Sequence, residues 1–228
     1  MNNGCSGDRV RRAARVPSMT AEQVTPSDRT LFDSPVLVVN QKGKLVELTN
    51  EYRVFDEDGR SLGSVVQTGQ GKARKVLRFL TDVDQFLTHR LEVRDASGAL
   101  QLVLTRPRKV VKSRLVVERP DGSHVGEIVQ QNVFGKIGFS MEAGGRQVGT
   151  LKAENWRAWN FCITDKDGKE VARITKKWAG LAKAAFTSAD NYVLEVHRPL
   201  EEPLRSLVVS TALAVDTALK QDAGGAIG

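Results

Sequence analysis

Two clusters of lysine and arginine are the residues whose types and spacing point most directly to chemistry. One lies in the segment GKARKVLR at 71–78, and the other lies in the segment RPRKVVKSR at 106–114. Basic side chains gathered on a folded surface attract phosphate groups, and each contributes about 1 kcal/mol near an anionic membrane. We interpret the clusters as a candidate cationic face that binds lipid head groups, with a solvated charged surface as the alternative. The side chains concerned are Lys72, Arg74, Lys75, Arg78, Arg106, Arg108, Lys109, Lys112 and Arg114.

Nucleic acid is the other phosphate-rich partner that the net charge of +7 would allow. Sites for single strands combine a basic groove with aromatic side chains on which the bases stack. Only Phe79 stands beside these clusters, while Trp156 and Trp159 lie elsewhere and are expected to pack against the domain or to anchor it at an interface. We therefore expect anionic phospholipids or a membrane surface as the partner. A protein- or nucleic-acid-binding module that uses the basic face is the alternative.

The sequence contains no recognisable catalytic constellation. His89, His124 and His197 are isolated from one another, and no nucleophile elbow, phosphate-binding loop, dinucleotide fingerprint or zinc spacing occurs. Cys5 and Cys162 are too few and too far apart for a disulfide framework, which favours a reducing compartment. We therefore expect a protein that is not a conventional enzyme and that needs no cofactor.

The first 30 residues are polar, contain several arginines and show no periodicity, so we predict a disordered basic tail over 1–30. No apolar stretch follows the first arginines, so no secretory signal is expected. A mitochondrial presequence is the alternative, although no apolar helix face supports it. We expect a cytoplasmic protein, peripheral at the inner face of a membrane.

Short β-prone runs separated by polar turns with glycine are the elements that must position the basic clusters. Asp and Asn favour tight turns, glycine supplies positive φ, and β-branched residues favour pleated strands. Runs such as Leu91-Glu92-Val93-Arg94 alternate apolar and charged side chains, as expected of strands with one buried face. The predicted hairpins lie at 36–48, 52–66, 91–105, 115–129, 137–151 and 161–174.

Six hairpins provide about twelve antiparallel strands, and a sheet of that size is expected to close because closure removes exposed edges. A Greek-key β-sandwich is the alternative. The most apolar segment, at 204–220, is apolar nearly all round, as expected of a buried helix that fills a wide barrel. Its strictly apolar part is about 9 residues long, whereas a membrane-spanning helix needs roughly 20, so a membrane anchor is the disfavoured alternative. We predict a mainly β domain over 31–221 with central helix 204–220 and a flexible tail over 222–228.

Two segments resemble the phospholipid scramblase and LURP-one-related families. The segment 174–194, ITKKWAGLAKAAFTSADNYVL, is similar to the stretch that precedes the last helix of scramblases, and 38–56 is similar to the start of the domain. The resemblance covers about residues 31–220 and implies a tubby-like barrel of twelve strands around a central helix. It also implies a link to phospholipids. The residues that match near the C-terminus are Lys177, Trp178, Ala179, Gly180, Leu181, Phe186, Thr187, Ala189, Asp190, Asn191 and Tyr192.

The sequence departs from the scramblase pattern at the acidic loop proposed to bind calcium. Asp190 is retained and Glu195 is nearby, but Ser188 and Pro199 occupy positions where that pattern has acids. Calcium takes six to eight oxygen ligands, so one or two carboxylates are not expected to hold it tightly. The cysteine cluster used for palmitoylation is also missing. We therefore expect head-group binding, electrostatic and reversible, because a barrel filled by its own helix offers lipids no hydrophilic path.

Overall fold

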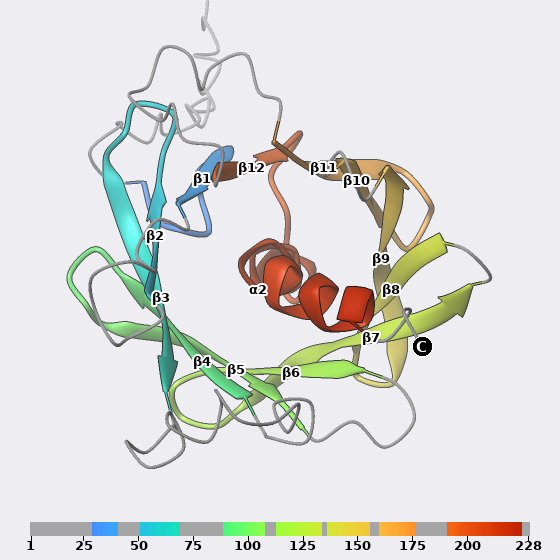
Figure 1. The fold of residues 1–228 in the computed structure, drawn as a ribbon. Helices are drawn as coiled ribbons and strands as arrows, with labels where there is room; N and C mark the ends of the chain where they lie inside the picture. Colours follow the sequence, from blue (N-terminus) through green and yellow to red (C-terminus); the bar gives the residue numbers. More distant parts are fainter. Residues whose placement is uncertain are drawn as a thin grey trace, which may run out of the picture.

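The computed structural model describes residues 29–40, 51–68, 89–107, 113–133, 136–155, 160–176 and 191–224, and these form a closed antiparallel barrel of twelve strands (Figure 1). Each strand pairs with its neighbours in sequence, and β1 pairs with β12 to close the barrel. The predicted barrel is confirmed, and the sandwich is excluded. The strands are β1 (Val36–Asn40), β2 (Glu51–Phe55), β3 (Ser61–Thr68), β4 (His89–Asp95), β5 (Leu100–Arg106), β6 (Arg114–Glu118), β7 (His124–Val133), β8 (Lys136–Ala143), β9 (Arg146–Asn155), β10 (Asn160–Asp165), β11 (Glu170–Thr175) and β12 (Asn191–Val196).

Five of the predicted hairpins are present as β2–β3, β4–β5, β6–β7, β8–β9 and β10–β11. The first one is present in part, since β1 is a strand and the second run at 45–48 lies outside the described residues. The sequence did not predict β12, which closes the barrel by pairing with β1 and β11. Its first four residues are all buried, so its pattern lacks the alternation that marks the other strands.

The hairpin turns use aspartate as predicted. The Oδ1 of Asp56, Asp95 and Asp165 each accepts hydrogen bonds from the backbone amides two and four residues later, at 2.8–3.0 Å. The third residue after each aspartate is a glycine with φ of 80° to 85°, which is the left-handed conformation that such turns require. These bonds satisfy amides that the sheet ladder leaves unpaired.

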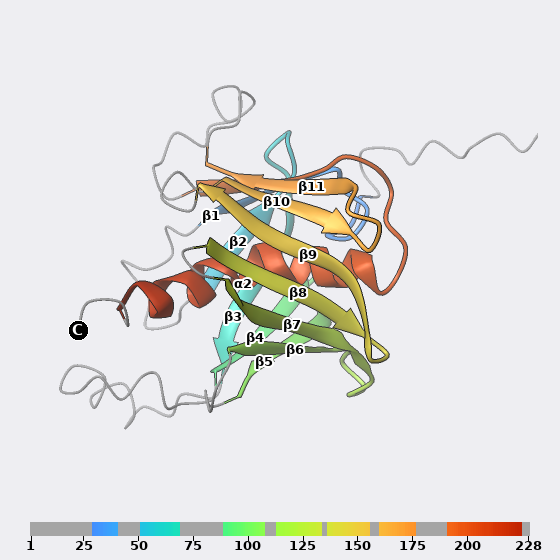
Figure 2. The same cartoon turned by 90° about the vertical axis from the view of Figure 1, so that its right-hand side faces the viewer.

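Antiparallel pairing between sequence neighbours makes successive connections alternate between the two ends of the barrel (Figure 2). One end, which we call the turn rim, carries the connections 56–60, 96–99, 119–123, 144–145, 166–169 and 197–203. The other end, which we call the basic rim, carries the connections 41–50, 69–88, 107–113, 134–135, 156–159 and 176–190. All connections of the turn rim are short, whereas the long connections 41–50, 69–88 and 176–190 all belong to the basic rim.

The helix α2 (Leu204–Gly224) enters the barrel from the turn rim and runs along its interior (Figures 1 and 2). Residues 206–214 are all at most 5% exposed, so this part of the helix is buried on every side, as its apolar pattern predicted. It begins at the predicted residue and continues past the predicted end at 220, because Gln221 and Ala223 favour helix. Within the part of the chain that the structure describes, no helix combines the length and the apolarity needed to cross a bilayer.

Two glycines on the inner face of the barrel allow α2 to approach the sheet closely. A Cβ atom at Gly126 would lie 2.4 Å from the carbonyl oxygen of Glu142 and 3.1 Å from Leu207 of the helix. At Gly149 it would lie 2.9 Å from Leu204. A Cβ atom at Gly149 would also lie 2.7 Å from the carbonyl oxygen of Thr164, so a larger residue at either glycine would clash with a strand backbone and press on a leucine side chain of α2.

We expect Gly126→Ala to lower the free energy of unfolding by about 1–3 kcal/mol, because the added methyl group would clash with the Glu142 carbonyl of β8 and press on Leu207 of α2. Urea denaturation followed by circular dichroism measures the change. Gly138→Ala is the matched control, since its new methyl group would meet its nearest neighbour at 3.6 Å and should cost little. Equal stability of the two variants would contradict the tight packing of the inner face around Gly126.

Candidate functional site

The two predicted basic clusters belong to connections at the same end of the barrel. The first lies between Thr68 of β3 and His89 of β4, and the second lies at the junction of β5 and β6. The register aligns these strand ends, because Thr68 pairs with Arg90 and His89 pairs with Arg106. The connections that hold the two clusters therefore leave the barrel side by side at the basic rim. Seven of the predicted side chains lie outside the described residues: Lys72, Arg74, Lys75, Arg78, Arg108, Lys109 and Lys112.

Positive charge is distributed unequally between the two rims. The connections of the basic rim contain thirteen lysines and arginines against four acidic residues, whereas those of the turn rim contain five against seven. The net positive charge of the chain is therefore concentrated on segments that attach at one end. The basic residues at that end are Lys42, Lys44, Lys72, Arg74, Lys75, Arg78, Arg108, Lys109, Lys112, Arg157, Lys176, Lys177 and Lys183.

The remaining two predicted head-group ligands are described by the structure and differ from each other. Arg106 is only 7% exposed, and its Nη2 donates a hydrogen bond of 2.6 Å to Oγ of Ser113. This bond joins the end of β5 to the residue before β6 and braces the start of the connection. Arg114 is exposed and lies 3.4 Å from Glu127 across the strand pair. A surface pair of this kind contributes little stability, so Arg114 can exchange partners at low cost.

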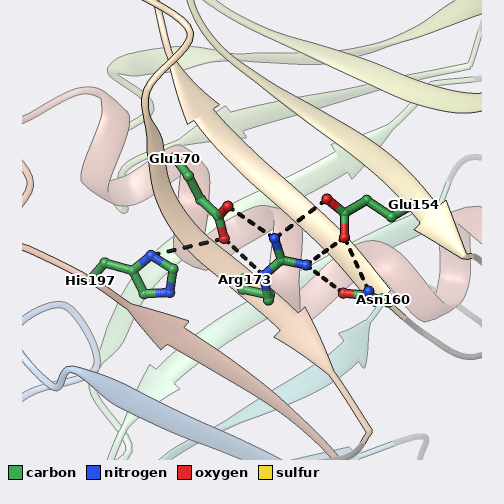
Figure 3. Close-up of polar contacts among 5 residues, drawn as sticks. All are labelled: Glu154, Asn160, Glu170, Arg173 and His197. Carbon is green, nitrogen blue, oxygen red and sulfur yellow. Dashed lines mark hydrogen bonds and ion pairs between the residues drawn. The ribbon is translucent and has the colours of Figure 1, made fainter.

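A second polar cluster, which the sequence did not predict, lies on the outer wall of the barrel around Arg173 (Figure 3). The guanidinium donates to Glu154 at 2.6 Å, to Asn160 at 2.7 Å and to both oxygens of Glu170 at 2.8 and 2.9 Å. Nδ1 of His197 lies 3.9 Å from Glu170. The cluster therefore ties together β9, β10, β11 and the chain that follows β12.

The charges in this cluster stabilise one another. The hydrogen bond from Arg173 is the main reason that the pKa of Glu154 and the pKa of Glu170 lie below their ordinary values. The same bonds, first to Glu154 and then to Glu170, raise the pKa of Arg173. Burial raises the pKa of the neighbouring Cys162 thiol, and the thiol's hydrogen bond to Glu170 adds to the effect. These shifts keep Glu154 and Glu170 ionised and Arg173 protonated near neutral pH, which fits a structural clamp.

The residues predicted as remnants of a calcium loop are not both described. Asp190 lies outside the described residues, while Glu195 lies in β12 directly across from Arg173 of β11. Among the residues that the structure describes, no three His, Cys, Asp or Glu side chains are grouped so that they could hold a metal ion.

The chain belongs to the Scramblase family, whose profile matches residues 20–219. This confirms the resemblance that the sequence motifs indicated. It is 26% identical over 198 residues to the phospholipid scramblase family protein C343.06c of Schizosaccharomyces pombe, covering 79% of this chain and 51% of that protein. It is 22% identical over 204 residues to altered inheritance rate of mitochondria protein 25 of Saccharomyces cerevisiae, covering 74% of this chain and 60% of that protein.

The chain therefore spans about half to three-fifths of the length of these two relatives. Among solved structures, it is similar to the X-ray structure of the Arabidopsis thaliana protein AT5G01750. The TM-score is 0.49 at 14% identity, and the match covers 81% of this chain and 93% of that one.

We expect Arg173→Met to lower the free energy of unfolding by about 1–2 kcal/mol at pH 7, because two carboxylates lose their charged donor at a partly exposed site. The deficit should shrink below the ordinary carboxylate range, since the lowered pKa values of Glu154 and Glu170 mean that their stabilisation is lost as acid protonates them. Denaturant titrations of the wild-type protein and of Arg173→Met at pH 7 and near pH 3 measure this stability deficit. A deficit that does not change with pH would contradict the electrostatic role of the cluster.

Proposed function

We propose that this Scramblase-family protein is a peripheral binder of anionic phospholipid head groups and that the basic rim is its contact surface. The observation that carries the proposal is the charge asymmetry between the rims, with thirteen basic against four acidic residues in the connections of one end. An excess of this size attracts a membrane that contains anionic lipids, and the attraction extends over about a Debye length. Because such lipids are enriched in cytoplasmic leaflets, we propose the cytoplasmic side of a membrane as the place of action.

The barrel interior supports binding in preference to lipid movement by the isolated domain. Moving a head group across a bilayer requires a hydrophilic path, and the interior of this barrel is filled by α2 with Leu207, Val208 and Leu213 fully or almost fully buried. The head groups would therefore remain at the rim. The membrane contact would be electrostatic and reversible.

A charge-matched pair of variants tests the location of the contact. One variant replaces Lys72, Arg74, Lys75 and Arg78 by glutamine, and the other replaces four basic residues of the turn rim in the same way. Both lose four positive charges, so a difference between them depends on position and not on net charge. The residues replaced in the control are Arg60, Arg119, Lys166 and Lys169, all of which are exposed.

We expect the basic-rim variant to bind anionic vesicles two to three orders of magnitude more weakly, at about 1 kcal/mol per residue, and the turn-rim variant to bind nearly normally. Co-sedimentation with neutral and anionic liposomes at low and high salt, with and without calcium, measures this. Equal losses in both variants would contradict the basic rim as the contact. Absence of any vesicle binding, combined with salt-sensitive binding to DNA, would favour the nucleic-acid module instead.

A further inference from the structure

A cavity of about 410 Å³ lies at the turn rim, where the chain leaves β12 and enters α2. Three parts of the chain line it: the segment 32–35 before β1, the segment 196–200 after β12, and one face of the first turns of α2. Its volume lies within the range of sites for small molecules, about 300–1,000 Å³. It is at the opposite end of the barrel from the basic rim, so it is separate from the proposed membrane contact.

The cavity has an apolar interior. Its floor is formed by Val208 and Val209 of the central helix, which are 0% and 3% exposed, and by Leu200, which is 8% exposed. Phe32 packs against the hydrophobic core and forms part of the wall. Because the floor itself exposes little surface, an apolar group that entered would displace water mainly from the partly exposed Phe32 and Val196 and the exposed Pro35 and Pro199, gaining about 25 cal/mol per Å² of apolar area buried.

Two arginines and a histidine stand beside this apolar floor. The Nη2 of Arg198 donates to Asp165 at 2.7 Å, and the Nη1 of Arg205 donates to Asp33 at 3.2 Å. Arg205 also donates from Nε to Glu202 at 3.1 Å. A guanidinium has five N–H donors, so both arginines keep donors for a further anion, and His197 also lines the cavity.

The ion pairs at the cavity mouth can be exchanged. The side chain of Asp33 is 46% exposed and that of Arg205 is 35% exposed, so their mutual attraction is screened by water and costs little to break. An anion that replaced Asp33 would meet a guanidinium in a planar geometry suited to carboxylate or phosphate. Exchange of Asp33 for a ligand anion, next to an apolar interior, therefore suits a ligand with an apolar body and one anionic end.

We propose that this cavity binds a small anionic amphiphile, with its charged end at Arg198 and Arg205 and its apolar chain along Phe32 and Val196 above the buried Val208 and Val209. A free fatty acid has a carboxylate as the charged end, and a lipid-derived phosphomonoester has a phosphate. Both ligands join one anionic group to an apolar chain, which is the combination that the cavity would recognise. Binding here is independent of the basic rim and of vesicle association.

Calorimetric titration of the full chain with decanoate, decyl phosphate, decanol and decylammonium tests the proposal. We expect the two anions to bind and the neutral and cationic probes to bind tenfold more weakly or worse, as loss of a charged hydrogen bond implies. Comparison of the affinities for decanoate and decyl phosphate shows whether the cavity prefers a carboxylate or a phosphate. Arg205→Met should weaken anion binding at least tenfold, and Arg60→Met, also on the turn rim, is the control that should leave it unchanged.

The NMR methyl resonances of Val208 and Val209 provide a second measurement, which does not depend on whether a variant folds. Decanoate should shift these two resonances in the wild-type protein and should leave the Val103 methyl resonances of β5 unchanged. Equal affinity for decanol and decanoate would overturn the charged recognition. Decanoate binding that leaves the two helix valines unshifted would overturn the location.

Discussion

The burial of one helix inside a closed sheet is the constraint on which the rest of this structure depends. A twelve-stranded barrel is too wide for its own side chains to fill, and α2 supplies the missing core. Nine consecutive helix residues, 206–214, are buried, and glycines at 126 and 149 bring the sheet close to them. Helix and sheet need each other, because neither would otherwise bury its apolar face.

Closure by sequential antiparallel pairing also determines where function can be located. Successive connections must alternate between the rims, so the tight aspartate turns gather at one end and the longer basic connections at the other. Basic and acidic residues are thereby distributed unequally between the two rims as a consequence of the strand order. One end carries an excess of cations, and the other combines nearly balanced charge with a cavity on the helix.

Local sequence predicted the hairpins and the buried helix because turn chemistry and periodicity act over a few residues. Asp95 and Gly98 mark their turn directly, and Leu91 and Val93 alternate with charged neighbours. The closing strand β12 has no such signal, because it is buried on both faces and its partners are distant in sequence. The Arg173 cluster was missed for a similar reason: Glu170 is local, but Glu154 and Asn160 meet Arg173 only through the pairing of β9, β10 and β11. The basic residues could be identified from the sequence, but only the strand order shows that the connections carrying them leave the barrel at the same rim.

Tryptophan fluorescence with vesicles of brominated anionic lipids tests most directly whether the basic rim contacts the membrane. The three tryptophans of the chain, Trp156, Trp159 and Trp178, all belong to connections of that rim. If this rim meets the membrane, their emission should shift to the blue and be quenched on vesicle binding, because indole favours the interface. The proposal would be contradicted if vesicle association left the emission of all three native tryptophans unchanged but quenched a tryptophan introduced by Lys166→Trp on the turn rim. That result would place the turn rim, and not the basic rim, at the membrane.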